Sequence, residues 1–129
     1  MLAIFTFTQA VIANNNSNTG IQLEALEGKN GAIFSGAVTA NDNNKYGISI
    51  VVVNNIVFDG SVTALGNVED DIYISDDSLV FFNNNVTAGS IKIDGDNNVT
   101  FNNSILDAVV SLENGNEGTL TFKGNSQTL

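Results

Sequence analysis

One apolar register recurs six times along the chain, and each copy is anchored on a phenylalanine. The anchors are Phe7, Phe34, Phe58, Phe82, Phe101 and Phe122. Two residues before each anchor stand Phe5, Ala32, Ile56, Val80, Val99 and Leu120. Four residues after it stand Val11, Val38, Val62, Val86, Ile105 and finally Ser126, where the pattern first breaks. No single copy is large enough to bury its own apolar face, so the repeat predicts a stack of like units with the phenylalanines in one buried column.

Each unit continues through a corner into a second apolar segment. The corner position is mostly glycine or asparagine (Gly36, Gly60, Asn84, Asn103), and we expect a positive φ there. Inward alanines then follow at Ala13, Ala40, Ala64 and Ala88, and Asp107 replaces the alanine in the fifth copy. The second segment alternates apolar and polar residues, with the pairs Ile21/Leu23, Ile48/Ile50, Ile72/Ile74, Ile91/Ile93 and Val110/Leu112. Alternation at period two predicts strands with one buried face.

The spacing between the two segments separates the copies into two kinds. From each phenylalanine to the next pair the distance is 14 residues in the first three copies and 9 in the next two. The extra residues fall at one site, within Asn14–Thr19, Asn41–Gly47 and Gly66–Asp71. Insertions confined to one corner are typical of a solenoid with lateral loops. Because loop length acts weakly on stability, we expect deletion of residues 41–45 to cost little.

A repeat of this size predicts an all-β fold, a right-handed parallel β-helix of about six rungs that spans residues 1–129 as one segment. Helical solenoids need longer periods and apolar residues at three- and four-residue spacing. An antiparallel sandwich is the alternative, but its strands would not need like residues at like positions. Stacking of equivalent corners would let the abundant asparagines form hydrogen-bonded ladders.

Composition excludes several classes of function. The net charge is −10, with four lysines and no arginine, which makes nucleic acid an unfavourable partner. The chain has no cysteine and no histidine, which excludes disulfides, the common nucleophilic triads and structural zinc sites. No run is long enough for a transmembrane helix, and we expect no membrane insertion of this segment. The apolar start, residues 1–13, fits the repeat as a first rung better than it fits a signal peptide.

Several short motifs resemble functional sites, but we interpret them as ordinary turn and surface residues. Asp94-Gly95-Asp96-Asn97-Asn98 resembles the start of a calcium loop, but positions six and twelve are Val99 and Ile105 instead of Gly and Glu, so we expect a polar turn. The groups Glu69-Asp70-Asp71 and Asp76-Asp77 flank a strand, and we expect solvated turn charges instead of a glycosidase pair. Three sequons begin at Asn85, Asn98 and Asn102 and are expected by chance in an asparagine-rich chain. The exposed aromatic candidates are Phe81, Tyr46 and Tyr73.

The repeat units themselves resemble those of a known family. Residues 32–40 (AIFSGAVTA) and 56–64 (IVFDGSVTA), together with 99–105 and 120–125, resemble passenger repeats of bacterial autotransporters. The asparagine-rich style without cysteine or proline is most similar to rickettsial surface cell antigens of the outer membrane protein A and B type. The resemblance implies secretion through a C-terminal β-barrel, display on the outer membrane and, for several members, adhesion to host cells and virulence. This chain lacks a barrel and end caps and ends inside a repeat, so we expect a fragment of a longer passenger whose own location is open.

We therefore expect a structural and adhesive β-helix that is not an enzyme. We expect no catalytic, cofactor-binding or metal-binding residues and no cofactor. A host-cell surface protein is the expected partner. The uncapped ends predict end-to-end self-association or frayed terminal rungs when the chain is made alone. The alternatives are a carbohydrate-active β-helix enzyme, which would need acidic residues from adjacent rungs to converge on one grooved face, and an inactive product of a split gene.

Overall fold

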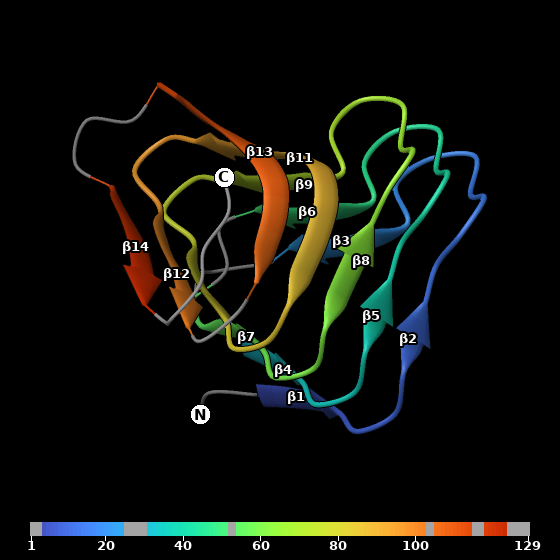
Figure 1. Cartoon of the computed structure of the whole chain (residues 1–129), viewed down its shortest axis with the longest axis horizontal. Coiled ribbons are helices and arrows are strands. Elements are labelled where there is room, and N and C mark those ends of the chain that lie inside the picture. Colours follow the sequence, from blue (N-terminus) through green and yellow to red (C-terminus); the bar gives the residue numbers. More distant parts are fainter. Residues whose placement is uncertain (1–3, 25–30, 52–53, 103–104, 115–117, 124–129) are drawn as a thin grey trace.

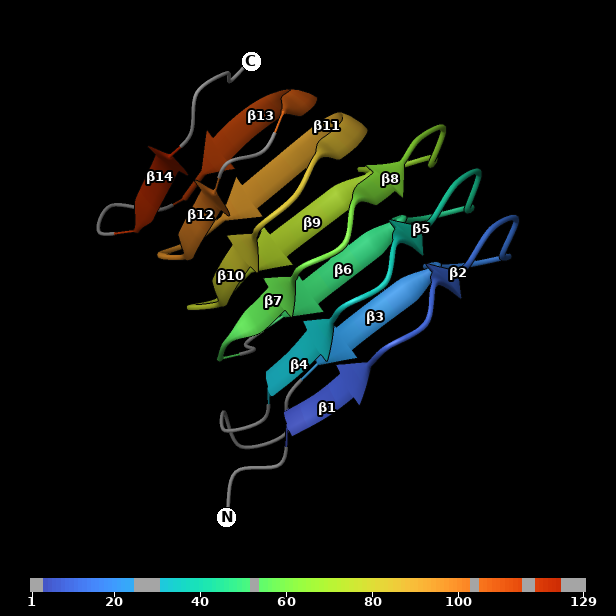
Figure 2. The ribbon, with the colours of Figure 1, turned by 60° about the horizontal axis from the view of Figure 1, so that its bottom comes forward.

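The chain folds into an all-β solenoid of about 4 turns. The computed structural model describes residues 4–24, 31–51, 54–102, 105–114 and 118–123, and none of these residues is helical. Every strand pairing within these ranges is parallel, and Figure 2 shows the successive coils as a regular staircase. The parallel β-helix is thereby confirmed and the antiparallel sandwich is excluded. The count of six rungs is not confirmed.

The phenylalanines lie in a six-stranded parallel sheet, which we call the phenylalanine sheet. Its strands, in spatial order, are β1 (Ile4–Phe7), β4 (Gly31–Phe34), β7 (Ile56–Phe58), β10 (Leu79–Phe82), β12 (Asn98–Asn102) and β14 (Thr119–Lys123). The register places each phenylalanine opposite the next one, for example Phe34 opposite Phe58 and Phe101 opposite Phe122. The sequence alignment of the anchors is therefore the actual strand register.

The opposite wall is an eight-stranded sheet that changes its construction along the solenoid. In the first three coils it has two short strands on either side of a loop. These are β2 (Val11–Ile12) and β3 (Ile21–Glu24), β5 (Val38–Thr39) and β6 (Ile48–Val51), and β8 (Val62–Ala64) and β9 (Ile72–Ser75). The next coil has one long strand, β11 (Val86–Asp94), which pairs with both β8 and β9. Strand β13 (Leu106–Glu113) then pairs with β11, and Figure 1 shows the loops only beside the earlier strands.

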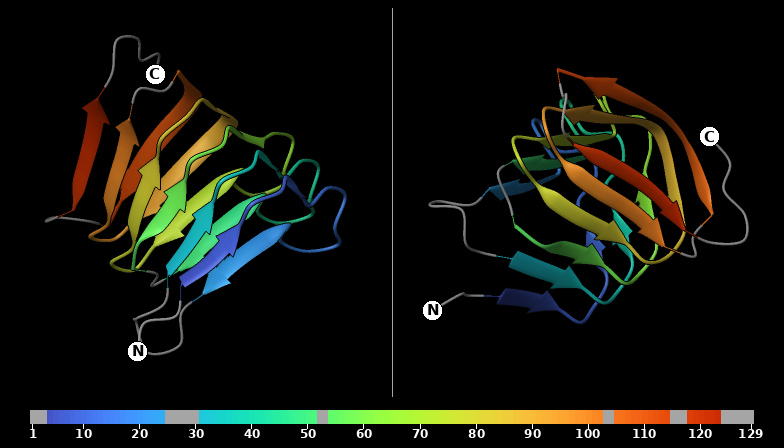
Figure 3. Two further views of the ribbon diagram at one scale, coloured as in Figure 1. Left: turned by 90° about the horizontal axis from the view of Figure 1, so that it is seen from below. Right: turned by 90° about the vertical axis from the view of Figure 1, so that its left-hand side faces the viewer.

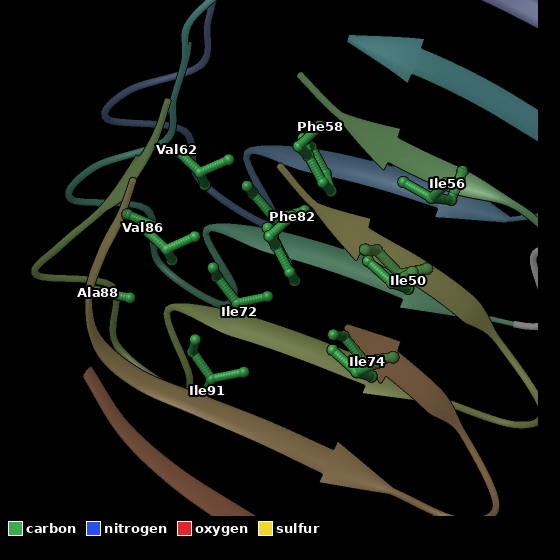
Figure 4. Close-up of a cluster of buried hydrophobic side chains, with 14 of the residues drawn as sticks. Ile50, Ile56, Phe58, Val62, Ile72, Ile74, Phe82, Val86, Ala88 and Ile91 are labelled. Carbon is green, nitrogen blue, oxygen red and sulfur yellow. The ribbon is translucent and has the colours of Figure 1, made fainter. Parts of the chain in front are cut away.

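The core consists of columns of like side chains. Successive phenylalanine rings are stacked with centroids 4.8–5.4 Å apart. Phe34, Phe58, Phe82 and Phe101 are at most 2% exposed, whereas Phe7 at the N-terminal end is 42% exposed. Figure 4 shows Phe58 and Phe82 of this column facing isoleucines of β6, β9 and β11 across the coil. The predicted column is confirmed, but its burial is complete only where a coil lies on both sides.

The fifth copy follows a different register from the predicted one. Leu106, and not Ile105, pairs with Val86 and points into the core, while Ile105 is 53% exposed. For the same reason Ala108 occupies the inward alanine position and Asp107 is exposed. One extra residue at the corner is compensated by one residue fewer before Val110, because the β11–β13 pairing shifts between Thr87 and Ser90. The spacing from Phe101 to Val110 therefore equals that from Phe82 to Ile91, and this equality conceals the one-residue register shift at Leu106. Ser126, the sixth residue of this column, lies outside the described residues.

The glycine corner after the phenylalanine does not have the predicted backbone. Gly36 and Gly60 lack a positive φ, and the described residues that have one lie elsewhere: Asn15, Asp42, Asn55, Gly66, Asp76, Asp77, Gly95 and Asn114. A Cβ on Gly60 would lie 2.2 Å from the carbonyl oxygen of Gly36, and a Cβ on Gly36 would lie 2.5 Å from the backbone of Gln9. Glycine is therefore required at this corner because backbones of adjacent coils approach closely, and not because of φ.

The three inserted segments project from one edge of the solenoid, as predicted, and Figure 3 shows them stacked on one another. Each begins with a left-handed residue: Asn15, Asp42 and Gly66 have φ of 57°, 56° and 71°. Their bases, however, are not solvated. Asn43 is completely buried and Asp71 is 5% exposed. Deletion of residues 41–45 would remove Asn43, so the expectation of a small cost does not hold.

Asn16, Asn43, Asn67 and Asp71 form a directed chain of hydrogen bonds, which we call the corner ladder. The backbone N–H and Nδ2 of Asn16 donate to Oδ1 of Asn43 at 3.0 and 2.8 Å. Asn43 donates in the same way to Oδ1 of Asn67 at 2.9 and 2.8 Å, and Asn67 to Oδ1 of Asp71 at 3.0 and 2.7 Å. Asparagine ladders are thus confirmed, and the expectation that Asp71 is a solvated turn charge is wrong.

Candidate functional site

One group of charged and aromatic side chains gathers on the outer surface of β9, β11 and β13 and on the adjoining loops. We call it the outer-face cluster, and its members are Lys45, Tyr46, Glu69, Asp70, Tyr73, Lys92, Asp94 and Glu113. Tyr73 lies between the buried Ile72 and Ile74, so alternation along β9 directs it outward. Lys92 pairs with Tyr73 in the next coil and faces the same way. Lys45 and Tyr46 come from the loop before β6, and Glu69 and Asp70 come from the loop before β9.

Two tyrosines form the aromatic part of the cluster. The rings of Tyr46 and Tyr73 are stacked with centroids 4.8 Å apart and an interplanar angle of 13°. Lys45 Nζ lies 5.2 Å from the centroid of the Tyr46 ring, within the range of a cation–π contact. The residue of β6 that pairs with Tyr73 is Ser49, which is small and buried. The sequence indicates both tyrosines as exposed aromatic candidates but does not predict their contact, because Tyr46 lies in an inserted loop outside the repeat register.

The charged part of the cluster is connected by hydrogen bonds between coils. Tyr73 Oη donates to Oδ2 of Asp94 at 3.1 Å, and Nδ2 of Asn114 donates to Oδ1 of the same carboxylate at 2.9 Å. Lys92 Nζ forms an ion pair with Oε2 of Glu113 at 3.1 Å. Both partners of that pair are substantially exposed, so it contributes little to stability. The network fixes the positions of the side chains more than it stabilises the fold.

The cluster contains acidic groups whose proton affinities are displaced in opposite directions. Burial raises the pKa of Asp70 above its usual value, although the Lys92 ammonium acts against this shift. Hydrogen bonds from Asn114 and then Tyr73 lower the pKa of Asp94. Displaced pKa values in one place are typical of functional surfaces, but ionic networks also produce them.

The pKa values of both tyrosines and of Lys92 are raised above their usual values. Burial, followed by the Glu69 carboxylate, raises the pKa of Tyr46 to about 12. Burial and the hydrogen bond to Asp94 also raise the pKa of Tyr73. The hydrogen bond to Glu113 raises the pKa of Lys92. At neutral pH both phenols are therefore hydrogen-bond donors and Lys92 is a cation.

The other motifs of the sequence lie apart from this cluster or at its edge. Residues 95–97 form the polar turn that was expected, with Gly95 at φ 92° and Asn97 buried beneath it, where its Oδ1 accepts from the Ser78 N–H at 2.9 Å. Asp76 and Asp77 are exposed, as predicted. Phe81 is half-buried on the outer side of the phenylalanine sheet. Of the sequon asparagines, Asn85 and Asn98 are exposed.

Two hollows lie at the C-terminal end of the part of the chain that the structure describes. One of about 60 Å³ is lined by residues of β11, β13 and β14 and the turns beside them, and Glu113 is its only lining residue from the cluster. Another of about 330 Å³ is lined by Val109, Val110, Leu112, Leu120 and Phe122. Over the described ranges, no group of three or more acidic, cysteine or histidine residues is placed to hold a metal ion. The same ranges contain no helix with the length and hydropathy to cross a bilayer.

Comparison with protein-family models, with curated proteins and with solved structures found no match for this chain. Function must therefore be argued from the surface itself. The cluster offers two stacked rings, phenolic donors, two ammonium groups and several carboxylates on the outer surface of the sheet and its loops. Such a surface suits recognition of a partner, because tyrosine supplies contact area at low entropic cost while charges give orientation.

Proposed function

We propose that this chain is a structural and adhesive β-helix, a segment of a surface-exposed autotransporter passenger without catalysis of its own. The observation that carries the proposal is the outer-face cluster on an otherwise regular solenoid. A stack of coils fixes the outward side chains of adjacent strands in register, so a binding face can be built without changing the core. The resemblance of the repeats to autotransporter passengers supplies the location, the bacterial outer surface, and the partner, a protein of the host-cell surface.

The proposal includes two finer features of the fold. We take the coil to be right-handed, because crossovers between parallel strands of one sheet are right-handed in nearly all proteins. We also take the stack to have about six rungs, with six stacked phenylalanines as its support. Crystallographic electron density for the chain would test both the hand of the coil and the number of rungs.

Adhesion is tested with beads coated with the purified chain and applied to cultured eukaryotic cells. The double variant Tyr46→Ala/Tyr73→Ala removes the stacked pair from the outer face, and we expect it to abolish most bead attachment. Phe81→Ala removes an aromatic side chain from the outer side of the other sheet and serves as the matched control. Attachment that is absent in the unaltered chain, or lost equally in both variants, would contradict the proposal.

Location is tested separately. Antibodies raised against the chain should label intact bacteria that produce it. Labelling that appears only after the outer membrane is permeabilised would place the protein inside and remove the basis for adhesion.

A carbohydrate-active enzyme is the second candidate, and one observation favours it. The pKa of Asp70 is raised and that of Asp94 is lowered, and glycoside cleavage needs one protonated and one ionised carboxyl group. Against it, Asp70 lies in the loop before β9, Asp94 lies at the end of β11, and neither lines a described hollow, whereas catalytic sites are concave. Release of reducing ends from a polysaccharide panel, abolished by Asp70→Asn or Asp94→Asn, would establish the enzyme and overturn our preference. A folded chain with neither attachment nor cleavage would support an inactive product.

A further inference from the structure

The last of the three inserted loops has an uncovered edge in the interior of the stack. We call residues 65–71, which connect β8 to β9, the third loop. The next two strands of this wall, β11 and β13, carry no loop, and Figure 2 shows the third loop projecting with no further loop on the β11 side. Because coils lie about 4.8 Å apart, two coils without loops leave a ledge about 10 Å wide beside the third loop. The ledge is bounded by β11 and β13, and not by an end of the chain.

The stacked loops are held together by backbone hydrogen bonds. Four such bonds join the second loop, residues 41–47, to the third, and each loop donates two of them. They run from the N–H of Asp42 to the C=O of Leu65 at 2.9 Å, from Gly47 to Asp70 at 3.3 Å, from Val68 to Asn43 at 3.0 Å and from Glu69 to Lys45 at 2.9 Å. A loop of this kind therefore presents two donors and two acceptors to the coil that follows it.

The equivalent groups of the third loop, 24 residues further along the chain, are mostly left open. The N–H of Asp71 takes the place of that of Gly47 and donates to Oγ of Ser90 at 3.1 Å. No described residue is bonded to the N–H of Gly66 or to the C=O groups of Asn67 and Glu69. One donor and two acceptors thus face the ledge, and an added chain could continue the pattern, as strands do at an open sheet edge.

Apolar side chains lie beside these open backbone groups. Val68 of the third loop and Val109 on the outer face of β13 are each 70% exposed, and Leu65 is also exposed. Val109 pairs with Ser90, the residue that contacts Asp71, so it lies on the ledge itself. Together they offer apolar contact area to a chain that lies along the edge.

The charge of the third loop selects the partner. It contains Glu69, Asp70 and Asp71 and no basic residue, and Asp107 adds a carboxylate on β13. Edges that are protected against pairing usually carry lysine or proline, whereas this edge exposes valine and leucine. An acidic edge repels a second acidic loop and attracts a basic segment.

We propose that the open edge of the third loop docks an extended segment of a partner protein that carries lysine or arginine. The segment forms a fourth layer on the stacked loops, bonded to the backbone of Gly66, Asn67 and Glu69, and covers Val68 and Val109. This contact goes beyond the adhesive function proposed above and lies apart from the stacked tyrosines. It is measured on the purified chain without cells, so peptide binding and cell attachment can each fail alone.

The probe is a synthetic peptide with the sequence of residues 63–72 that carries Glu69→Lys, Asp70→Lys and Asp71→Lys. It reproduces a loop that stacks on its like, and its lysines supply the opposite charge. In a titration of the isotope-labelled chain followed by nuclear magnetic resonance, the amide signal of Gly66 should shift and its hydrogen exchange should slow, because the N–H gains a partner. The amide of Gly95 already donates to the C=O of Glu113 at 2.9 Å and should not change.

Two control peptides separate backbone pairing from charge and from self-association. The unsubstituted peptide of residues 63–72 represents a second copy of this chain, and a scrambled lysine peptide has the charge without the order of the loop. Both should bind at least about tenfold more weakly than the probe. Equal binding of the unsubstituted peptide would identify a second copy as the occupant, and equal binding of the scrambled peptide would show attraction by charge alone. Either result would overturn the proposal, as would an unshifted Gly66 signal at about 1 mM probe.

Variants of the chain locate the bound peptide on the ledge. Val68→Ala and Glu69→Gln should each weaken probe binding about threefold, because one removes apolar contact and the other removes a charge. Their matched controls are Ile105→Ala, at the corner before β13, and Asp77→Asn, in the turn after β9, where both side chains are exposed away from the third loop. Equal weakening by the controls would overturn the assignment of the site to this edge.

Discussion

The three coils with loops and the coils without them build the same two-sheet core with different connections in the second sheet. In the early coils the chain leaves the sheet after β2, β5 and β8 and returns at β3, β6 and β9. In the later ones β11 runs straight through as a strand of nine residues. Both kinds share the same phenylalanine column, whose ring spacing is 5.0 Å between Phe34 and Phe58 and 4.9 Å between Phe82 and Phe101. The packing of the phenylalanine column is therefore the same in coils with and without a loop. The structural difference between the two kinds of coil is confined to the corner from which the loops project.

The corner ladder shows what the difference requires chemically. Asn43 accepts from Asn16 in the loop before it and donates to Asn67 in the loop after it, and an asparagine can repeat such a link from coil to coil because its side chain both donates and accepts. At β11 no further loop follows, and the chain places Asp71, which accepts only. Its Oδ1 accepts from Asn67, and its Oδ2 accepts from the backbone N–H of Ser90 at 3.1 Å. Gly89 leaves room for this carboxylate, since a Cβ there would lie 2.6 Å from Oδ2. The carboxylate closes the ladder where the loops end.

The largest effect should come from the column that both regions share. Phe58→Ala in a coil with a loop and Phe101→Ala in a coil without one should each cost about 3–5 kcal/mol of unfolding free energy, because both rings are at most 1% exposed. Phe7→Ala should cost much less, since that ring is 42% exposed. Urea unfolding of the three variants measures this. A clear difference between Phe58→Ala and Phe101→Ala would show that the loops do affect the core.

The next effect should come from reversing one donor within the ladder. Asn67→Asp removes the Nδ2 that donates to Asp71 and to the carbonyl oxygen of Ala40, and it places carboxylate oxygens against both acceptors. We expect a loss of about 2–3 kcal/mol at neutral pH. Asn41→Asp is the matched control, because the side-chain oxygen of Asn41 accepts from the Leu65 N–H and its amide donates to no partner among the described residues. Equal losses in the two variants, measured by urea unfolding, would mean that the direction of the ladder is unimportant.

A smaller effect should follow from removing the acceptor that closes the ladder. In Asp71→Asn one oxygen becomes an amide donor, which must face either the Asn67 donors or the Ser90 N–H. We expect a loss of about 1–2 kcal/mol. The exposed Asp76→Asn has the same change in charge and should be nearly neutral. If Asp71→Asn stabilises the chain in urea, repulsion among the acidic groups outweighs the hydrogen bonds at this corner.

The predictable part of the fold was the part that repeats. The anchors and the paired isoleucines could be aligned because like-on-like stacking makes register visible as periodicity. The shift at Leu106 was missed, since an extra corner residue and a shortened strand cancelled in the total spacing. The burial of Asp71 and the Tyr46–Tyr73 contact were missed for another reason. Both depend on where a loop ends relative to the neighbouring coil, and a single-copy feature leaves no periodic trace.

The smallest expected effect concerns the outer face, where one carboxyl group of a coil with a loop, Asp70, is compared with one of a coil without, Asp94. The lowered pKa of Asp94 stabilises the fold above its ordinary value of 3.8, and that contribution is lost as the pH falls through the lowered pKa. The raised pKa of Asp70 has the opposite sign. It costs stability at neutral pH, and the cost disappears as the pH falls through the raised pKa towards 3.8.

The two substitutions should therefore act in opposite directions. Asp94→Asn should lower the midpoint of thermal unfolding at neutral pH and flatten its decline in acid. Asp70→Asn should raise the neutral midpoint and leave a steeper decline in acid. Both effects should be small, because charges near the surface are screened by solvent and salt. Circular dichroism melts from about pH 7 down to about pH 3 bracket the ordinary pKa of both groups. Parallel profiles for the two variants would show that the network around Tyr73 does not couple protonation to folding.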